Sequence, residues 1–200
     1  MQTRFGWLLT IALCGIAPFV PSLFAQQDSL RPKKILTPEQ QAYQQERVAY
    51  QAKRESIQAQ AALVFRAEMA REQAGDCPDA ASTYDSNVCF GKQLAITDEN
   101  LKSYEGFIHD LQTPPPPIPG VPALNSPGPA GPSLSSQELA AEFDRVEQSW
   151  RQYRETACTA AFHQFEGGTG GPGFEMQCEL KLKRDHMREL DAIYFMVLHK

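Results

Sequence analysis

QSWRQYRETAC, residues 148–158, decides the fold together with the glycine run GGTGG at 167–171 and Cys178. Apolar residues recur at steps of three or four through and around this stretch, which places them on one face of a helix. Because a glycine run does not continue a helix cheaply, the chain is expected to turn there. We therefore predict a helical hairpin with a cysteine on each arm. The residues expected to face inward from its first arm are Leu139, Phe143, Val146, Trp150, Tyr153, Ala157, Ala161, Phe162 and Phe165.

Both arms of this hairpin have predictable ends. Ser135 and Glu138 form a capping box that starts the first arm, and the apolar pattern carries it to about Phe165. The second arm is expected to start near Phe174. Its apolar residues are Leu180, Leu182, Met187, Leu190, Ile193, Tyr194 and Val197.

A long polar and amphipathic helix is predicted over 37–75. Thr37, Pro38 and Gln40 supply the N-cap, the first-turn proline and the partner of a capping box. An apolar residue recurs every seven positions, which fits either a coiled-coil arm or a helix that packs one stripe on the domain. Alanine and polar residues dilute this seam, so self-association is not favoured. The recurring residues are Tyr43, Tyr50, Ile57 and Val64.

A further helix is predicted over about 83–112, capped by Ser82 with Asp85. Nine prolines then fall within 113–133, which is typical of a semi-rigid linker between helices. Binding of this run to an aromatic groove on a partner is the alternative. We predict an all-α fold: a small disulfide-stapled helical bundle over 76–198, interrupted by this linker and preceded by the long helix.

The amino-terminal residues 1–25 are typical of a signal peptide. Arg4 precedes a mostly apolar run, and the cleavage region ends at Ala25. A membrane anchor or a lipoprotein site at Cys14 is the alternative, but the run is short for a span and Cys14 lies inside it. Residues 26–36 lack periodicity and are expected to be a disordered entry. The mature protein is therefore expected outside the cytoplasm, in the periplasm or secreted, without a membrane span.

The net charge and the cysteine content of the chain argue against some classes of function. Loss of 1–25 removes one arginine and no acidic residue, so the net charge changes from −5 to −6. This argues against a nucleic-acid partner. Four cysteines remain, which in an exported chain suggests two disulfides with three possible pairings. The chain lacks Cys-x-x-Cys, which disfavours a zinc cluster. The remaining cysteines are Cys77, Cys89, Cys158 and Cys178.

No catalytic motif, metal motif or cofactor motif occurs in the sequence. The histidines are not at His-Glu-x-x-His spacing, and neither a Gly-x-Ser-x-Gly elbow nor a phosphate-binding loop occurs. We therefore expect a non-enzymatic protein without a cofactor. Arg154 lies beside the predicted inward face, where a partly buried guanidinium needs an acidic or carbonyl partner. The alternative is that this side chain extends to water.

Several spaced residues form a recognisable pattern. Two cysteines are separated by eleven residues, an Asp and a Leu follow, and a Gln-x-Trp-x-x-Tyr-Arg segment leads through a glycine turn to a last cysteine. This pattern resembles the LprI-like domain family, which is named for a lysozyme inhibitor. The matching residues are Cys77, Cys89, Asp98, Leu101, Gln148, Trp150, Tyr153, Arg154, Cys158, Gly167, Gly168, Thr169, Cys178 and Leu190.

The chain also departs from the family pattern. Glu155 replaces an Asp, Lys102 an Asn, Lys183 a Thr and His186 an Arg. The insert at 113–133 is longer than the connection expected. The resemblance covers about Cys77 to Ile193 apart from this insert. It implies an exported, all-helical, disulfide-stapled domain that binds another protein, with lysozyme as the leading partner. An envelope adaptor acting through the 37–75 helix and the linker is the second hypothesis, and an enzyme is the third.

Three structural expectations complete the interpretation. We expect the bonds Cys77–Cys89 and Cys158–Cys178, since each joins neighbouring elements around a local turn. We expect Arg154 to pair with Asp98 or another acid on the 83–112 helix. The expected partner-binding surface is the turn after the first arm, although it also fits a simple chain reversal. Its residues are Glu166, Gly167, Gly168, Thr169 and Glu175.

Overall fold

A computed structural model describes residues 36–120, 134–165 and 168–199. The expected signal peptide, the entry segment up to residue 35 and most of the proline-rich linker lie outside these ranges. Within them, no helix combines the length and apolar character that crossing a membrane requires.

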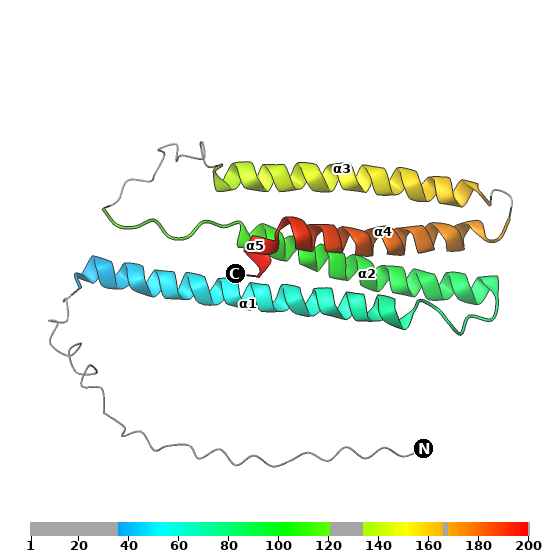
Figure 1. Ribbon diagram of the computed structural model, residues 1–200, viewed down its shortest axis with the longest axis horizontal. Coiled ribbons are helices and arrows are strands. Elements are labelled where there is room, and N and C mark those ends of the chain that lie inside the picture. Colours follow the sequence, from blue (N-terminus) through cyan, green and yellow to red (C-terminus); the bar gives the residue numbers. More distant parts are fainter. Residues whose placement is uncertain (1–35, 121–133, 166–167, 200) are drawn as a thin grey trace, which may run out of the picture. The chain divides into compact units, whose positions relative to one another are not determined.

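The described residues contain helices and no strand, so the predicted all-α class is confirmed. Four long helices are followed by one short helix. Figure 1 shows them as stacked, nearly aligned rods in the order α3, α4, α2, α1. They are α1 (Pro38–Ala74), α2 (Thr83–Leu111), α3 (Ser136–His163), α4 (Gly171–Ile193) and α5 (Phe195–Leu198).

Side-chain caps set the starts of three helices. Thr37 and Ser135 each form a complete capping box, and Ser82 accepts a hydrogen bond from the backbone of Asp85. The start predicted for α4 near Phe174 is wrong by three residues. Pro172 lies in the first turn of α4, where its fixed φ suits a helix and its missing N–H costs nothing, so the helix begins earlier.

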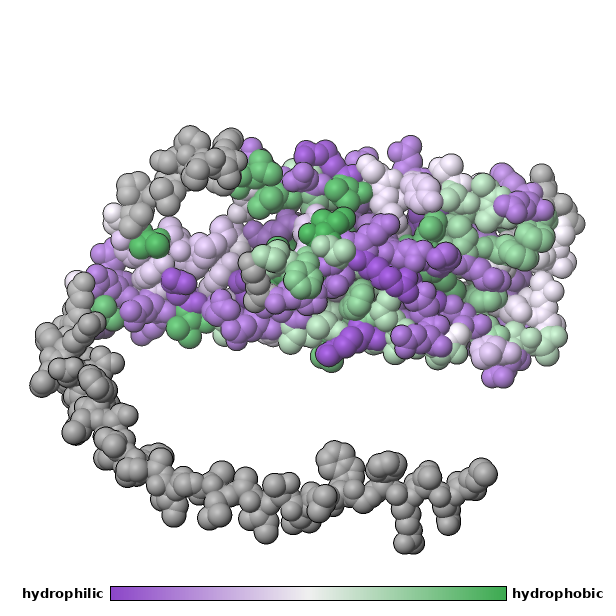
Figure 2. All heavy atoms as spheres, in the orientation of Figure 1, coloured by the Kyte–Doolittle hydropathy of each residue, from purple (hydrophilic) through white to green (hydrophobic). Residues whose placement is uncertain are grey.

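The core lies where α4 packs between α2 and α3, with α1 packed along α2. The short α5 contacts α1, α2 and α4. Figure 2 shows that polar side chains cover much of the visible face of the helices, with apolar side chains between them. The buried apolar residues of the connected core are Ile57, Ala61, Leu101, Tyr104, Ile108, Leu111, Phe143, Met187, Leu190 and Leu198.

Helix α1 docks on the domain through the stripe that contains Ile57 and Ala61, both of which are buried. Side chains of α1 also donate to backbone carbonyls elsewhere. Tyr50 donates to Thr113 O at 2.8 Å, and Arg54 donates to Leu111 O at 2.6 Å. Since these bonds join residues far apart in sequence, they hold α1 against the end of α2.

The inward face predicted for α3 is partly wrong. Tyr153 is 60 % exposed. Leu139 and Val146 are also exposed, at 39 % and 37 %. Glu147 and Cys158 are buried instead. The buried face is therefore rotated from the predicted one, because charged groups on α2 and α4 supply partners for polar residues of α3. The spacing of apolar residues in the sequence gives no information about such partners on other helices.

Glu68 on α1 is fully buried at the junction of α1, α2 and α4. Arg184 donates to it at 2.8 Å, Asn100 at 2.7 Å and Thr97 at 2.8 Å. Burial by itself raises the pKa of Glu68, but these hydrogen bonds outweigh it, so the pKa lies below the ordinary value. Because each carboxylate oxygen has donors, this network joins three helices without an unpaired charge.

Candidate functional site

Both predicted disulfides are confirmed. Cys77 is bonded to Cys89, and Cys158 to Cys178. The first bond ties the α1–α2 connection to α2, and the second ties α3 to α4. We call this region the stapled end: it comprises the α1–α2 connection, the first turns of α2 and the α3–α4 turn (Figure 1).

The α3–α4 turn is built around close backbone approaches. The N–H of Gly168 donates to Phe165 O at 2.9 Å. A Cβ atom on Gly171 would lie 3.1 Å from the Phe162 ring, and one on Gly173 would lie 2.8 Å from Asn87 Oδ1. The second distance is too short for a real contact, so a side chain at 173 would displace the Asn87 side chain of α2, and glycine leaves room for it.

An aromatic pair lies at this turn. The rings of Phe165 and Phe174 are stacked, with centroids 3.8 Å apart and planes 10° from parallel. Phe165 is 37 % exposed and Phe174 is 45 % exposed, so the prediction that Phe165 faces inward is wrong. Tyr84 and Val88 on the adjoining turns of α2 are also exposed. Exposed aromatic side chains are enriched where proteins bind one another.

The residues predicted as a partner-binding turn are only partly described. Gly168 and Thr169 are exposed, and Glu175 is half-buried. Glu166 and Gly167 lie outside the described residues. Exposed Asp85 at the start of α2 adds negative charge to the stapled end. The Phe165–Phe174 stack was not predicted as part of this surface, although two phenylalanines that flank a glycine run are a usable signal for it.

The predicted pairing of Arg154 with Asp98 is wrong. Arg154 Nε lies 3.2 Å from Glu179 Oε2 on α4, as an ion pair without an aligned hydrogen bond. The guanidinium also lies over the Trp150 ring, 5.1 Å from its centroid. Asp98 pairs with Lys183, which also reaches Glu179. The lysine on α4 therefore takes the position that sequence reasoning gave to Arg154.

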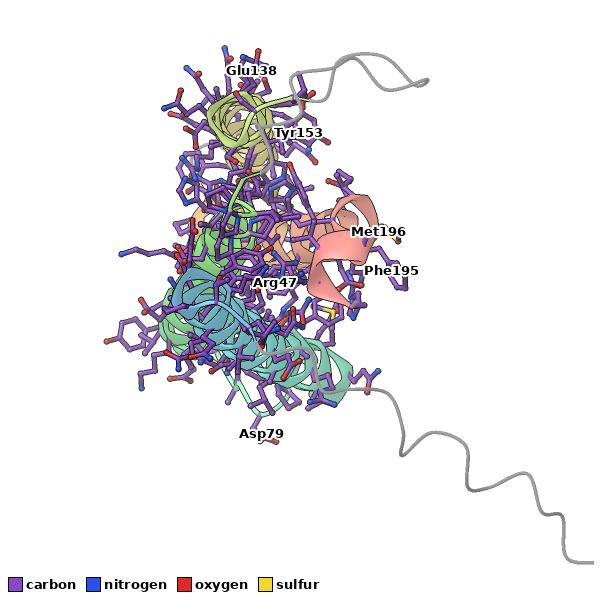
Figure 3. The ribbon with its side chains drawn as sticks, turned by 90° about the vertical axis from the view of Figure 1, so that its left-hand side faces the viewer. Arg47, Asp79, Glu138, Tyr153, Phe195 and Met196 are labelled. Atoms are coloured by element: carbon purple, nitrogen blue, oxygen red, sulfur yellow. A yellow bond between two sulfur atoms is a disulfide. The ribbon has the colours of Figure 1, made fainter. Side chains whose placement is uncertain are left out.

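The remaining motif residues separate into core and surface. Leu101 is buried, and Trp150 is half-buried against His186, with ring centroids 3.9 Å apart. Gln148 and Glu155 are exposed on α3, as is Tyr153, which Figure 3 labels. The motif thus describes how α3 packs on α4 more than it describes one site.

The described residues thus form an all-helical domain with two disulfides and an exposed aromatic pair at one end. Comparison with known protein families identifies the family of this domain. Residues 76–190 match the family described as "Lysozyme inhibitor LprI", and the chain belongs to this family. No curated protein and no solved structure matches the chain.

The family match covers α2, α3 and most of α4, together with all four disulfide cysteines. Helix α1 lies outside it. The family is one of inhibitors, and its match together with two disulfides indicates an extracytoplasmic protein.

Proposed function

We propose that the protein binds lysozyme outside the cytoplasm and inhibits it without catalysing a reaction. The observation that carries the proposal is the exposed Phe165–Phe174 stack at the stapled end of an LprI-family domain. Membership of an inhibitor family supports the partner, and the stack supports the place of contact.

The physical argument rests on preorganisation. The stack lies on a turn whose two flanking helices are cross-linked by Cys158–Cys178. A surface that is ordered before binding loses little conformational entropy when a partner covers it. Stacked aromatic rings add a large apolar area that a concave partner surface can cover. The proposed contact is therefore insertion of this turn into the substrate cleft of lysozyme.

Charge adds a second argument. The full chain has a net charge of −5, and Asp85 and Glu175 lie at the stapled end. Attraction between an acidic surface and a cationic lysozyme raises the association rate and weakens as salt screens it. We expect inhibition to be stronger at low ionic strength than at high ionic strength.

The direct test is lysis of cell walls by lysozyme with and without excess protein, at low and at physiological salt. The proposal predicts slower lysis, with the larger effect at low salt. An equally acidic, unrelated helical protein serves as the control for charge alone. Undiminished lysis together with the absence of binding by calorimetry would refute the proposal.

An envelope adaptor is the second candidate, and one observation favours it. The first turns of α1 carry an open, shallow surface in which Val48 is 69 % exposed. Its lining residues are Gln41, Gln44, Gln45, Val48, Ala49 and Ala52. If the adaptor hypothesis holds, Val48→Glu abolishes retention of the protein by the envelope and leaves lysozyme unaffected.

Export is part of the proposal. We expect cleavage after Ala25, so that the mature protein begins near Gln26 and is released from the membrane. Intact-mass measurement of the protein from the extracytoplasmic fraction tests this. A full-length mass in the membrane fraction would contradict it.

A further inference from the structure

Three ionisable side chains from three helices meet beside the core. They are Glu105 on α2, Glu147 on α3 and His186 on α4, and their nearest ligand atoms all lie within 4.8 Å of one another. Glu147 and His186 are each 2 % exposed, and the Glu105 side chain is 14 % exposed. Because they are far apart in sequence, no sequence motif brings them together.

The contacts of this cluster are incomplete. His186 Nε2 lies 3.0 Å from Glu147 Oε1, while Glu147 Oε2 has no hydrogen-bond partner. Arg151 donates to Glu105 at 3.0 Å and approaches Glu147 Oε2 only to 3.9 Å. The Arg151 side chain is itself 55 % exposed. Besides the His186 imidazole, the half-exposed Arg151 guanidinium is the cationic group that approaches these two largely buried carboxylates.

Two carboxylates that face each other cannot satisfy each other, since both only accept hydrogen bonds when ionised. Glu105 and Glu147 lie close together and are largely shielded from water, so their negative charges repel each other. A positive species between the two carboxylates removes this repulsion. A proton or a metal ion can supply that charge. The contacts of the His186 imidazole favour the metal ion.

The surroundings of His186 resemble those of a metal ligand. Its Nδ1 lies 3.4 Å from Glu189 Oε2, and Trp150 stacks on the ring. A histidine that ligates a metal commonly directs its other N–H to a carboxylate, which fixes the tautomer. In the metal-free protein, an Nε2–H group can donate to Glu147 Oε1. With the proton on Nδ1 instead, the Nε2 lone pair faces the two carboxylates and is free to bind a metal ion.

We propose that Glu105, Glu147 and His186 bind a divalent transition-metal ion, with Zn²⁺ the best match. One imidazole nitrogen and two carboxylate oxygens are a donor set that zinc accepts, with water as a further ligand. Ligand atoms around tetrahedral zinc lie roughly 3.3 Å apart, so the three side chains need to close by about 1.5 Å at most. The ion neutralises both carboxylates and cross-links α2, α3 and α4.

The first test uses thermal unfolding of the full chain without a histidine tag, in zinc chloride and in EDTA. Zinc is expected to raise the midpoint of the wild-type chain by about 5 °C or more. Glu105→Gln should lose this rise and, in EDTA, should unfold at a midpoint no lower than that of the wild-type chain, because the Gln amide can donate to Glu147. His109→Gln, which changes an exposed histidine elsewhere on α2, should keep the rise.

The second test uses cobalt chloride, whose visible absorption reports coordination geometry. Bands of a four- or five-coordinate ion are expected with the wild-type chain and not with Glu147→Gln. Glu189→Gln should weaken zinc binding about 10-fold to 100-fold without abolishing it. A wild-type chain without a zinc-dependent rise and without cobalt bands would overturn the proposal and leave a shared proton as the occupant. A rise that persists in both Glu105→Gln and Glu147→Gln would overturn it as well.

Discussion

The two ends of the helical unit are held together by different interactions. At the stapled end, two disulfides join neighbouring elements, and Arg184 donates twice to Asp76 at 2.5 and 2.9 Å. At the end that carries α5, the described elements are joined by non-covalent contacts: Gln58 donates to Val197 O at 2.7 Å, and Tyr104 donates to Asp191 at 2.8 Å. Both ends expose aromatic side chains, but only one rests on covalent cross-links.

This difference bears on which exposed aromatic surface is suited to binding. Phe195 on α5 is 55 % exposed and projects from a helix of four residues (Figure 3). Phe174 is less exposed, but it stacks on Phe165 and follows a turn fixed by glycine contacts. If exposure were the sole criterion, α5 would be the better candidate for the binding surface. Preorganisation favours the α3–α4 turn instead.

The largest effect is expected from Glu68→Ala. It leaves Arg184 buried without part of its charge compensation, which typically costs about 3–5 kcal/mol of unfolding free energy. His199→Ala removes a partly exposed pair with Asp191 at the other end and should cost less than about 1 kcal/mol. Urea unfolding measures both. Equal losses would show that the buried Glu68–Arg184 pair stabilises the domain no more than the partly exposed pair at the α5 end does.

Replacement of Cys158 and Cys178 by Ser together should come next. A loop of 20 residues corresponds to about 3 kcal/mol in the chain-entropy model. If the account is right, hydrogen exchange then speeds up mainly in the α3–α4 turn and leaves α5 as it was. Uniform acceleration along the chain would mean that the bond stabilises the whole domain without ordering the turn.

A pH effect of about 1–3 kcal/mol is expected from Glu105 in EDTA. Its folded pKa of about 7 lies above the ordinary value of 4.5, so the folded state binds more protons between these values. This contribution is present below pH 4.5 and is lost as pH rises through 7. Glu105→Gln should flatten the decline in unfolding free energy from pH 5 to pH 8. An unchanged slope in the variant would place the titration elsewhere.

A small stability effect is expected from Arg154→Ala. The side chain is partly exposed, and its ion pair with Glu179 lacks an aligned hydrogen bond, so a loss of about 1 kcal/mol is expected. A double-mutant cycle with Glu179→Ala should give a small coupling, and one with Asp98→Ala should give none. Coupling to Asp98 that exceeds coupling to Glu179 would restore the pairing first predicted from the sequence.

Local signals carried most of what the sequence predicted correctly. The capping boxes at Thr37 and Ser135 and the two short-range disulfides depend on residues close in the chain. The face of α3 depends instead on partners on other helices, such as His186 for Glu147. An apolar pattern assigns Glu147 to solvent, because burial of a carboxylate becomes acceptable only when its distant partners are known.

The candidate site shows the same limit. The sequence located the turn but predicted that Phe165 faces inward, since it extends the apolar stripe of α3. In the structure, α3 ends at His163, and the end of the helix releases Phe165 to stack on Phe174 across the glycines. Helix ends are determined by competition between capping and packing, and a shift of two residues here changes a core residue into a surface one.

The most direct test of the account is calorimetric titration of lysozyme with two matched variants, Phe174→Ala and Phe195→Ala. Each removes one exposed phenylalanine ring, one from the stapled end and one from α5. The account predicts that Phe174→Ala weakens binding about 30-fold, the loss expected of a binding hot spot, and that Phe195→Ala binds like the wild-type chain. Equal binding by both variants, or a loss confined to Phe195→Ala, would contradict the assignment of the α3–α4 turn as the lysozyme-binding surface.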